Sequence, residues 1–113
     1  MSESDFEVKD SGKREEFPSG MRRDTEDGKR DYTLIFDGPL ADRYAEHMSK
    51  GARKYGEKNW MKAATEAEYK RFRRSAARHF IAWLRGVTDE DHAAATLFNI
   101  MAAEYVAERM ASE

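Results

Sequence analysis

The chain has 113 residues, about one domain, with 40% hydrophobic and 37% charged residues and a formal net charge of −2. Such a balance gives no overall positive field for duplex DNA or an anionic membrane, and the absence of cysteine excludes disulfides, thiolate metal sites and cysteine nucleophiles. No run approaches the roughly 18 apolar residues of a membrane-spanning helix, and the start lacks the pattern of a secretory signal, so we expect a soluble, cytoplasmic protein.

The N-terminal third is polar. Residues 1–30 mix charges with Ser, Gly and Pro and contain little apolar surface to offset chain entropy, which favours a poorly ordered arm. Residues 32–36 then form a β-prone run that ends at the turn signal Asp37-Gly38-Pro39. We expect a short strand there, or an extended segment packed on the helices.

Three helices are predicted after this run. The first covers residues 39–55, with proline at its first position and Gly56 at its end. The second starts at Thr65, whose capping box is completed by Glu68, and ends at Gly86. The third is predicted to start at Thr88, where acidic residues suit the helix dipole, and to run to about residue 110.

Each predicted helix carries an apolar stripe at three- and four-residue spacing, which favours an all-α fold, a small helical bundle of three main helices plus a partly ordered N-terminal arm. The broad stripe of the third helix suggests burial against more than one neighbour, and we expect a homodimer or a larger oligomer. The stripes are Leu40, Tyr44, Met48, Ala52 and Tyr55, then Tyr69, Phe72, Ala76, Phe80 and Trp83, then Ala93, Leu97, Ile100, Met101, Tyr105 and Val106.

An acidic cluster stands at the predicted start of the third helix. Carboxylates bind hard cations such as Mg²⁺, and an imidazole among them would admit a transition ion. The alternative is that acids gather there only because the helix dipole favours them. Asn99 lies two turns beyond the histidine on the same helix face. The candidate metal ligands are Asp89, Glu90, Asp91 and His92.

Basic and aromatic residues gather in residues 51–60. Lysines there can contact phosphates, and aromatic rings can stack on a base. The alternative is a helix end whose bases match the dipole, followed by a tryptophan anchor. Gly51 inside a helix costs about 1 kcal/mol relative to alanine, which suggests a close approach by another helix or a ligand. Arg78 with His79 could likewise hold phosphates, or belong to a solvated face beside the core.

Several motifs in this order resemble the phage-type dATP/dGTP diphosphohydrolase family, which is similar to the MazG-like all-helical nucleotide pyrophosphohydrolases. They are SGMRRD at 19–24, GKRDYTLI at 28–35, GARKYG at 51–56, Asn59-Trp60, Arg78-His79, and Glu90-Asp91-His92 with Asn99. The resemblance implies an oligomeric helical enzyme that cleaves purine dNTPs to monophosphate and pyrophosphate with Mg²⁺ or Mn²⁺. It also implies order from about residue 19, which leaves residues 1–16 as a disordered polar arm and 17–113 as one nucleotide-binding domain.

Two departures from the MazG-like pattern keep a second function open. Paired carboxylate motifs on facing helices are typical of those enzymes, whereas this chain has Arg78-His79 and His92-Ala93-Ala94-Ala95. The first hypothesis is the pyrophosphohydrolase, the second a non-catalytic phage protein that sequesters a nucleotide, and the third a structural helical oligomer. The predicted catalytic residues are Glu90, Asp91 and His92, and the predicted nucleotide contacts are Lys54, Tyr55, Lys58, Asn59, Trp60, Arg78, His79 and Asn99.

Overall fold

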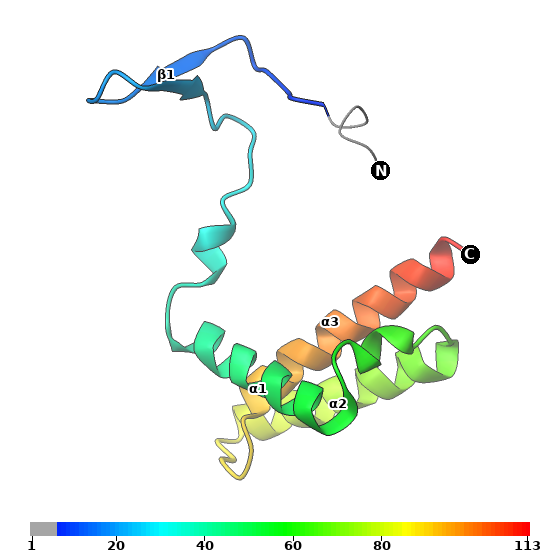
Figure 1. The fold of residues 1–113 in the computed structure, drawn as a ribbon. Coiled ribbons are helices and arrows are strands. Elements are labelled where there is room, and N and C mark those ends of the chain that lie inside the picture. Colours follow the sequence, from blue (N-terminus) through cyan, green and yellow to red (C-terminus); the bar gives the residue numbers. More distant parts are fainter. Residues whose placement is uncertain (1–6) are drawn as a thin grey trace. The chain divides into compact units, whose positions relative to one another are not determined.

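The computed structural model describes residues 7–113, so residues 1–6 of the predicted arm lie outside it. The chain divides into two compact units, one that ends at Asp31 and one that covers Tyr32–Glu113. The second unit contains the helices that the sequence predicts, and Figure 1 shows the elements in chain order. None of the described helices combines the length and the apolar character that crossing a bilayer requires.

The first unit contains a two-stranded antiparallel hairpin that the sequence did not predict. Strand β1 (Arg14–Glu16) pairs with β2 (Arg22–Asp24) so that Arg14 lies opposite Asp24, and Glu16 opposite Arg22. Opposite charges that face each other across two strands stabilise the strand pair. The sequence prediction was based on the low apolar content of this segment and did not consider such charge pairs. The backbone N–H of Ser11 also donates to both Asp24 carboxylate oxygens, at 3.1 Å each.

Both predictions for residues 32–36, a short strand or an extended segment packed on the helices, are wrong. Tyr32–Ile35 form a single 3₁₀ turn, η2, and every residue of the turn is exposed. A strand needs a hydrogen-bonding partner, and the only strand pair among the described residues is β1 with β2.

The helical unit consists of α1 (Pro39–Tyr55), the short turn η3 (Asn59–Lys62), α2 (Glu66–Leu84) and α3 (His92–Ala111). The predicted bounds of α1 and the capping box of α2 are confirmed: Thr65 Oγ1 accepts from Glu68 N, and the Glu68 carboxylate accepts from Thr65 N. Helices α2 and α3 run antiparallel and share the most extensive contact in the unit (Figure 1).

Helix α3 is the centre of the bundle and contacts more than one neighbour, as expected, but its buried face is not the predicted stripe: Val106 is buried, whereas Leu97 and Ile100 are exposed. Its buried residues include His92, Ala95, Asn99, Ala102 and Val106, spaced three or four apart. Small side chains at this spacing let a neighbouring helix lie close.

A second side of α3 packs against α1 and η3. Tyr44 Oη donates to Met101 Sδ at 3.0 Å, and the Trp60 ring lies edge-on to Tyr105 with centroids 5.2 Å apart. Arg109 Nη1 donates to the carbonyl of Met61 at 3.0 Å, which ties η3 to the end of α3.

Two helix predictions need correction. Helix α3 begins at His92 rather than at Thr88, because the Asp91 carboxylate accepts from Ala94 N and acts as the N-cap. The far half of the α2 stripe is not core: Phe80 is 45% and Trp83 is 52% exposed. Instead, His79 faces α3 at this level.

Candidate metal centre

Two histidines from different helices meet where α2 ends and α3 begins. His79 Nδ1 lies 2.8 Å from His92 Nδ1, and the two ring centroids are 5.1 Å apart. Glu90 comes just before α3, and together the three side chains offer ligand atoms that all lie within 4.8 Å of one another. His92 is only 7% exposed, His79 is half-buried and Glu90 is exposed, so the cluster opens to solvent on the side of the carboxylate.

Local sequence brings this cluster together. Gly86 takes a left-handed φ of +72°, which suits glycine, and closes the C-terminus of α2. A short connection then leads to Asp91, which caps α3, so His92 becomes its first residue. The backbone N–H of His92 donates to the Glu90 carbonyl at 3.0 Å, a turn that keeps Glu90 beside the two imidazoles.

Asp89 orients His92. Its Oδ1 lies 2.7 Å from His92 Nε2, and this hydrogen bond holds the pKa of the Asp89 carboxyl below its ordinary value. Because a carboxylate only accepts, the proton belongs on Nε2 of His92, which leaves Nδ1 as a lone-pair donor pointed at His79. A carboxylate that fixes the far nitrogen of a ligating histidine is a common feature of protein metal sites.

His79 is held in the form that a metal needs. Burial lowers the pKa of its imidazole, Glu90 opposes this shift, and electrostatic interaction with His92, Arg78 and His47 lowers the pKa further. A metal binds the neutral imidazole, so this environment keeps the donor available near neutral pH.

The donor set suits some divalent ions better than others. Two nitrogen atoms and one carboxylate fit Mn²⁺, Fe²⁺ or Zn²⁺, whereas Mg²⁺ prefers oxygen ligands in a strict octahedron. Two metal–nitrogen bonds of about 2.1 Å at a tetrahedral angle would separate the nitrogens by about 3.4 Å. The observed distance between the Nδ1 atoms is 2.8 Å, so a small rotation of the two imidazole rings would bring both atoms to chelating positions.

Asp91 is not brought into the cluster. Arg43 donates to both of its oxygens, Nε to Oδ2 at 2.8 Å and Nη2 to Oδ1 at 2.7 Å, and Ala94 N donates to Oδ1 at 3.1 Å. The Arg43 fork lowers the pKa of Asp91 to about 2. With both oxygens engaged, Asp91 fixes the start of α3 instead of offering a free ligand atom.

The predicted nucleotide contacts fall into two groups. Lys54, Tyr55 and Lys58 are exposed at the end of α1 and just beyond it, with the Lys54 ammonium 5.1 Å from the Tyr55 ring centroid. Trp60 packs edge-on against Phe98 and Tyr105, as the anchor alternative predicted, beside the half-buried Asn59.

The remaining predicted contacts lie on α2 and α3. Arg78 is exposed directly before His79, at the rim of the cluster. Asn99 is buried and its side-chain amide donates to the Ala95 carbonyl at 2.8 Å, so it supports α3 internally.

Two residues near the cluster were missed by sequence reasoning. Arg43 holds Asp91, and His47 is half-buried on α1 with its ring centroid 5.7 Å from that of Phe98. Electrostatic interaction with His47 contributes to lowering the pKa of both His79 and Asp91. Its position three residues after Tyr44, on the inner stripe of α1, was the signal that could have identified it.

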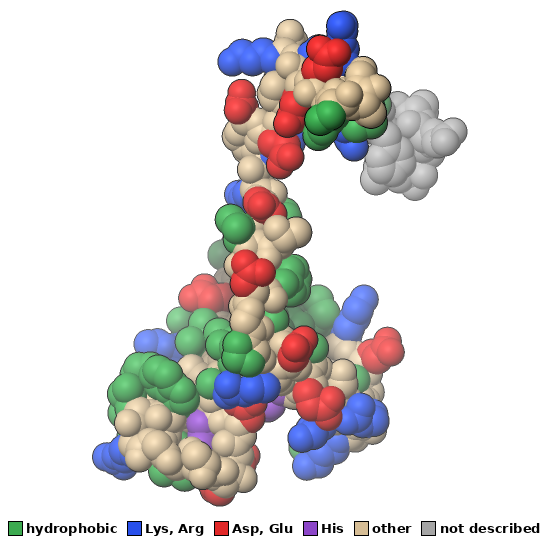
Figure 2. All heavy atoms as spheres, turned by 90° about the vertical axis from the view of Figure 1, so that its left-hand side faces the viewer, with side chains coloured by type: hydrophobic (Ala, Val, Ile, Leu, Met, Phe, Trp, Pro, Cys, Tyr) green, Lys and Arg blue, Asp and Glu red, His purple; other side chains and the backbone are tan. Residues whose placement is uncertain are grey.

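The surface of the helical unit is partly apolar. Figure 2 shows hydrophobic side chains at the surface on one side of this unit. The exposed apolar residues of α2 and α3 are Phe80, Ile81, Trp83, Leu84, Leu97 and Ile100.

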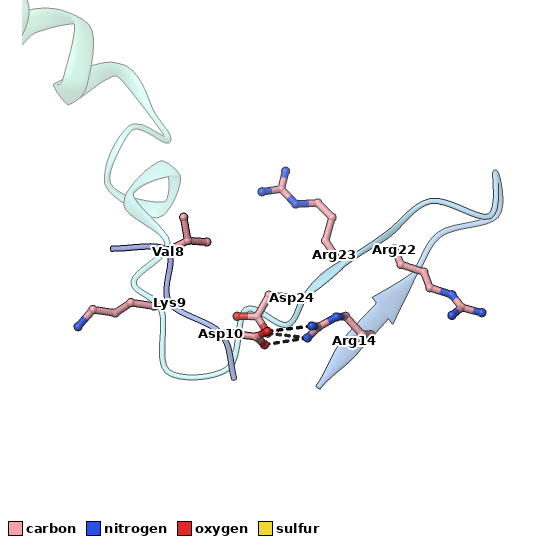
Figure 3. A pocket seen from close by; sticks show the side chains of 7 residues that line it. All are labelled: Val8, Lys9, Asp10, Arg14, Arg22, Arg23 and Asp24. Carbon is pink, nitrogen blue, oxygen red and sulfur yellow. Dashed lines mark hydrogen bonds and ion pairs between the residues drawn. The ribbon is translucent and has the colours of Figure 1, made fainter. Parts of the chain in front are cut away.

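A separate hollow lies in the N-terminal unit, lined by charged residues of the hairpin and the segment before it (Figure 3). Two of its charged residues pair with each other: Arg14 donates to both oxygens of Asp10, at 2.8 and 2.9 Å. This hydrogen bonding lowers the pKa of Asp10 to about 2. Lys9, Arg22 and Arg23 also line the hollow, and none of them takes part in an ion pair with another described residue.

Comparison with known proteins agrees with the resemblance seen in the motifs. A family model described as dATP/dGTP diphosphohydrolase, N-terminal, matches residues 19–113. No curated protein and no solved structure shows a significant match to the chain. The family match includes the hairpin strand β2, both histidines of the cluster and all three long helices. The chain belongs to the dATP/dGTP diphosphohydrolase N-terminal family.

Proposed function

We propose that this protein is a metal-dependent pyrophosphohydrolase that converts purine deoxynucleoside triphosphates into monophosphate and pyrophosphate. The observation that carries the proposal is the His79–Glu90–His92 cluster in a member of the dATP/dGTP diphosphohydrolase family. The reaction adds one water across the bond between the α- and β-phosphates, and the purine preference rests on the family description alone.

The chain's own residues have distinct roles in this proposal. His79 and His92 hold the ion through Nδ1, Glu90 adds an oxygen ligand, and Asp89 keeps the His92 ring oriented. When bound, a divalent ion neutralises phosphate charge and lowers the pKa of water, which is the chemistry that hydrolysis of a phosphoanhydride requires. Arg78, next to His79, supplies a guanidinium for the phosphates.

In this proposal the nucleoside part of the substrate lies at the C-terminal end of α1. His47 lies near the cluster, and Tyr55 is eight residues further along the same helix, about 12 Å at 1.5 Å per residue. The exposed ring of Tyr55 and the ammonium groups of Lys54 and Lys58 are the groups that a bound nucleotide could reach there. Trp60 is excluded from base stacking in this assignment because its ring packs between Phe98 and Tyr105.

A second candidate is a non-catalytic protein that sequesters a nucleotide. Among the described residues the cluster has a single carboxylate, Glu90, whereas the MazG-like pattern has paired acidic motifs. Fewer carboxylates mean fewer ligands for the metal ions that bind the triphosphate and activate water for its hydrolysis. Nucleotide that stays bound in EDTA and is recovered intact would favour this candidate.

The test is a panel of incubations with each dNTP and NTP, with Mn²⁺ or Mg²⁺, read by chromatography. The expected products are dAMP or dGMP with pyrophosphate, formed faster with Mn²⁺. Glu90→Gln and His92→Asn should each lower turnover by at least 100-fold, while Glu104→Gln, at an exposed position of α3, should not. Unchanged turnover in the Glu90 and His92 variants would contradict the metal centre.

We also propose a homo-oligomer. Leu97 and Ile100 are 41% and 49% exposed, one turn apart on α3. Burying such side chains between two copies would remove their apolar area from water. Size-exclusion chromatography with light scattering should give a dimer or larger species, and Ile100→Lys should shift it toward the monomer. A wild-type monomer at high concentration would contradict this.

A further inference from the structure

Helix α2 carries a dense row of cations that the metal centre does not use. Its arginines are Arg71, Arg73, Arg74 and Arg78, and a fifth arginine, Arg85, is its C-cap. Among the described residues no carboxylate lies within ion-pair distance of any of them; the ion pair on this helix is Lys70 with Glu66, at 3.3 Å. Uncompensated guanidinium groups on one helix are the natural counterpart of an anion.

Two of these arginines converge on one side chain. Arg71 Nη1 donates to Ser75 Oγ at 2.6 Å, and Arg78 Nη2 donates to the same oxygen at 3.1 Å. Like charges repel, so two guanidinium groups gathered at one neutral hydroxyl form a place where a shared anion is favoured. Each guanidinium has five N–H donors, and one bond to Ser75 leaves the others available.

The convergence point lies beside the metal centre. Ser75 and His79 are four residues apart on α2, so they share a face and are separated by about 6 Å along the helix axis. Arg71 lies one further turn back in the same row. A phosphate held at the His79–Glu90–His92 cluster would therefore have its neighbouring phosphates over Ser75, between the two arginines.

We propose that Arg71, Ser75 and Arg78 form a polyphosphate subsite that binds the phosphates of the nucleotide beyond the one at the metal centre. This inference rests on the proposed function for the identity of the ligand. The guanidinium forks match phosphate oxygens in geometry, and the Ser75 hydroxyl can donate its own proton to a phosphate oxygen. Arg71 and Ser75 are the residues that this assignment adds to the nucleotide site.

The test uses inorganic tripolyphosphate in EDTA, so that the metal centre takes no part in binding. Isothermal titration calorimetry on the full chain should show binding that weakens as salt rises. Arg71→Gln should weaken it about tenfold, since it removes one charge-assisted fork while keeping helix propensity. Ser75→Ala should weaken it by about threefold, the loss expected for one modest hydrogen bond.

The matched control is Arg74→Gln, which removes the same charge from an exposed position of the same helix; among the described residues it is Arg71 and Arg78, and not Arg74, that donate to Ser75 Oγ. It should bind tripolyphosphate within twofold of wild type. Equal losses in Arg71→Gln and Arg74→Gln would show a diffuse charge effect and overturn the subsite. No binding by wild type, or binding of a single-stranded oligonucleotide in preference to tripolyphosphate, would overturn it as well.

Failure of the subsite and failure of the proposed function give different results. If Arg71→Gln binds tripolyphosphate like wild type while wild type hydrolyses dNTPs, the subsite is wrong and the enzyme assignment stands. If tripolyphosphate binding depends on Arg71 but no nucleotide is cleaved with any ion, the subsite stands and the protein is a nucleotide-binding protein. Unchanged Mn²⁺ binding by Arg71→Gln confirms that the variant is folded.

Discussion

His79 and His92, thirteen residues apart in the chain, place their Nδ1 atoms 2.8 Å from each other across the α2–α3 contact. At this distance one nitrogen donates and the other accepts, so the pair shares a single proton between the two Nδ1 atoms. A divalent ion would replace that proton and use both lone pairs. The pair is thus already gathered for chelation before an ion binds, and the orientation of His92 depends on its other contact, to Asp89.

The contact between Asp89 and His92 leads to the first prediction. Asp89→Asn should weaken Mn²⁺ binding by about 10- to 100-fold, the usual effect of removing a carboxylate that orients a ligating histidine. Isothermal titration with Mn²⁺ measures the affinity, and Glu104→Gln, at an exposed position of α3, is the control. Mn²⁺ affinity unchanged in Asp89→Asn would contradict the role of the Asp89 carboxylate in orienting His92.

Asp91 should matter for stability rather than for the metal. Asp91→Ala removes the N-cap of α3 and should lower the free energy of unfolding by about 1 kcal/mol, measured by urea denaturation. Asp91→Asn retains a good capping group and should lose less, through the weakened contact with Arg43. Mn²⁺ affinity should be the same in Asp91→Asn and wild type; a loss as large as that of Glu90→Gln would make Asp91 a metal ligand after all.

The capping box of α2 predicts a pH dependence of stability. The Ala64 backbone N–H, the Thr65 hydroxyl and the Thr65 N–H donate to Glu68, and these bonds hold the pKa of its carboxyl below the ordinary value. A lowered folded pKa means that the contribution is complete above the unfolded pKa of about 4.3 and is lost as pH falls through the folded value.

Urea denaturation between pH 7 and pH 3 measures this contribution. The difference in unfolding free energy between wild type and Glu68→Gln should shrink as pH falls below about 4.3, because protonated Glu68 resembles glutamine. Glu66→Gln is the control, since Glu66 pairs with Lys70 and takes no part in the cap. A difference that stays constant across this range would contradict the role of the Glu68 carboxylate.

Local chemistry explains which elements the sequence predicted well. Pro39 and Gly56 bound α1, and Thr65 with Glu68 starts α2, because these signals act through backbone groups within a few residues. The start of α3 was wrong because Thr88 and Asp91 are both good N-caps locally. Asp91 also receives the Arg43 fork from 48 residues away, a tertiary contact that helix-capping patterns cannot contain.

The sequence named the residues of the candidate site but did not predict that they come together in one cluster. Glu90, His92 and His79 were all identified, yet His79 was assigned to the nucleotide because the face of α2 that meets α3 was unknown. The apolar stripe predicted that Phe80 and Trp83 would face inward, whereas His79 occupies that level and both aromatic side chains are about half exposed. Similarly, residues 32–36 have strand propensity but no partner strand, so they form the exposed turn η2.

Gly51 offers a last prediction, because the sequence suggested a close approach at this position that the chain itself does not make. A Cβ built on Gly51 meets no described atom within 4 Å, and its backbone is helical. Gly51→Ala should therefore raise the free energy of unfolding by about 1 kcal/mol, while Ala45→Gly, at an exposed position of the same helix, should lower it by a similar amount.

If a second copy or a nucleotide lies against Gly51, the added methyl group will weaken self-association or the binding of tripolyphosphate and dNTPs, while the monomer becomes more stable. Urea denaturation and light scattering separate the two effects, and a destabilised Gly51→Ala monomer would mean that the space beside this helix is filled within the chain.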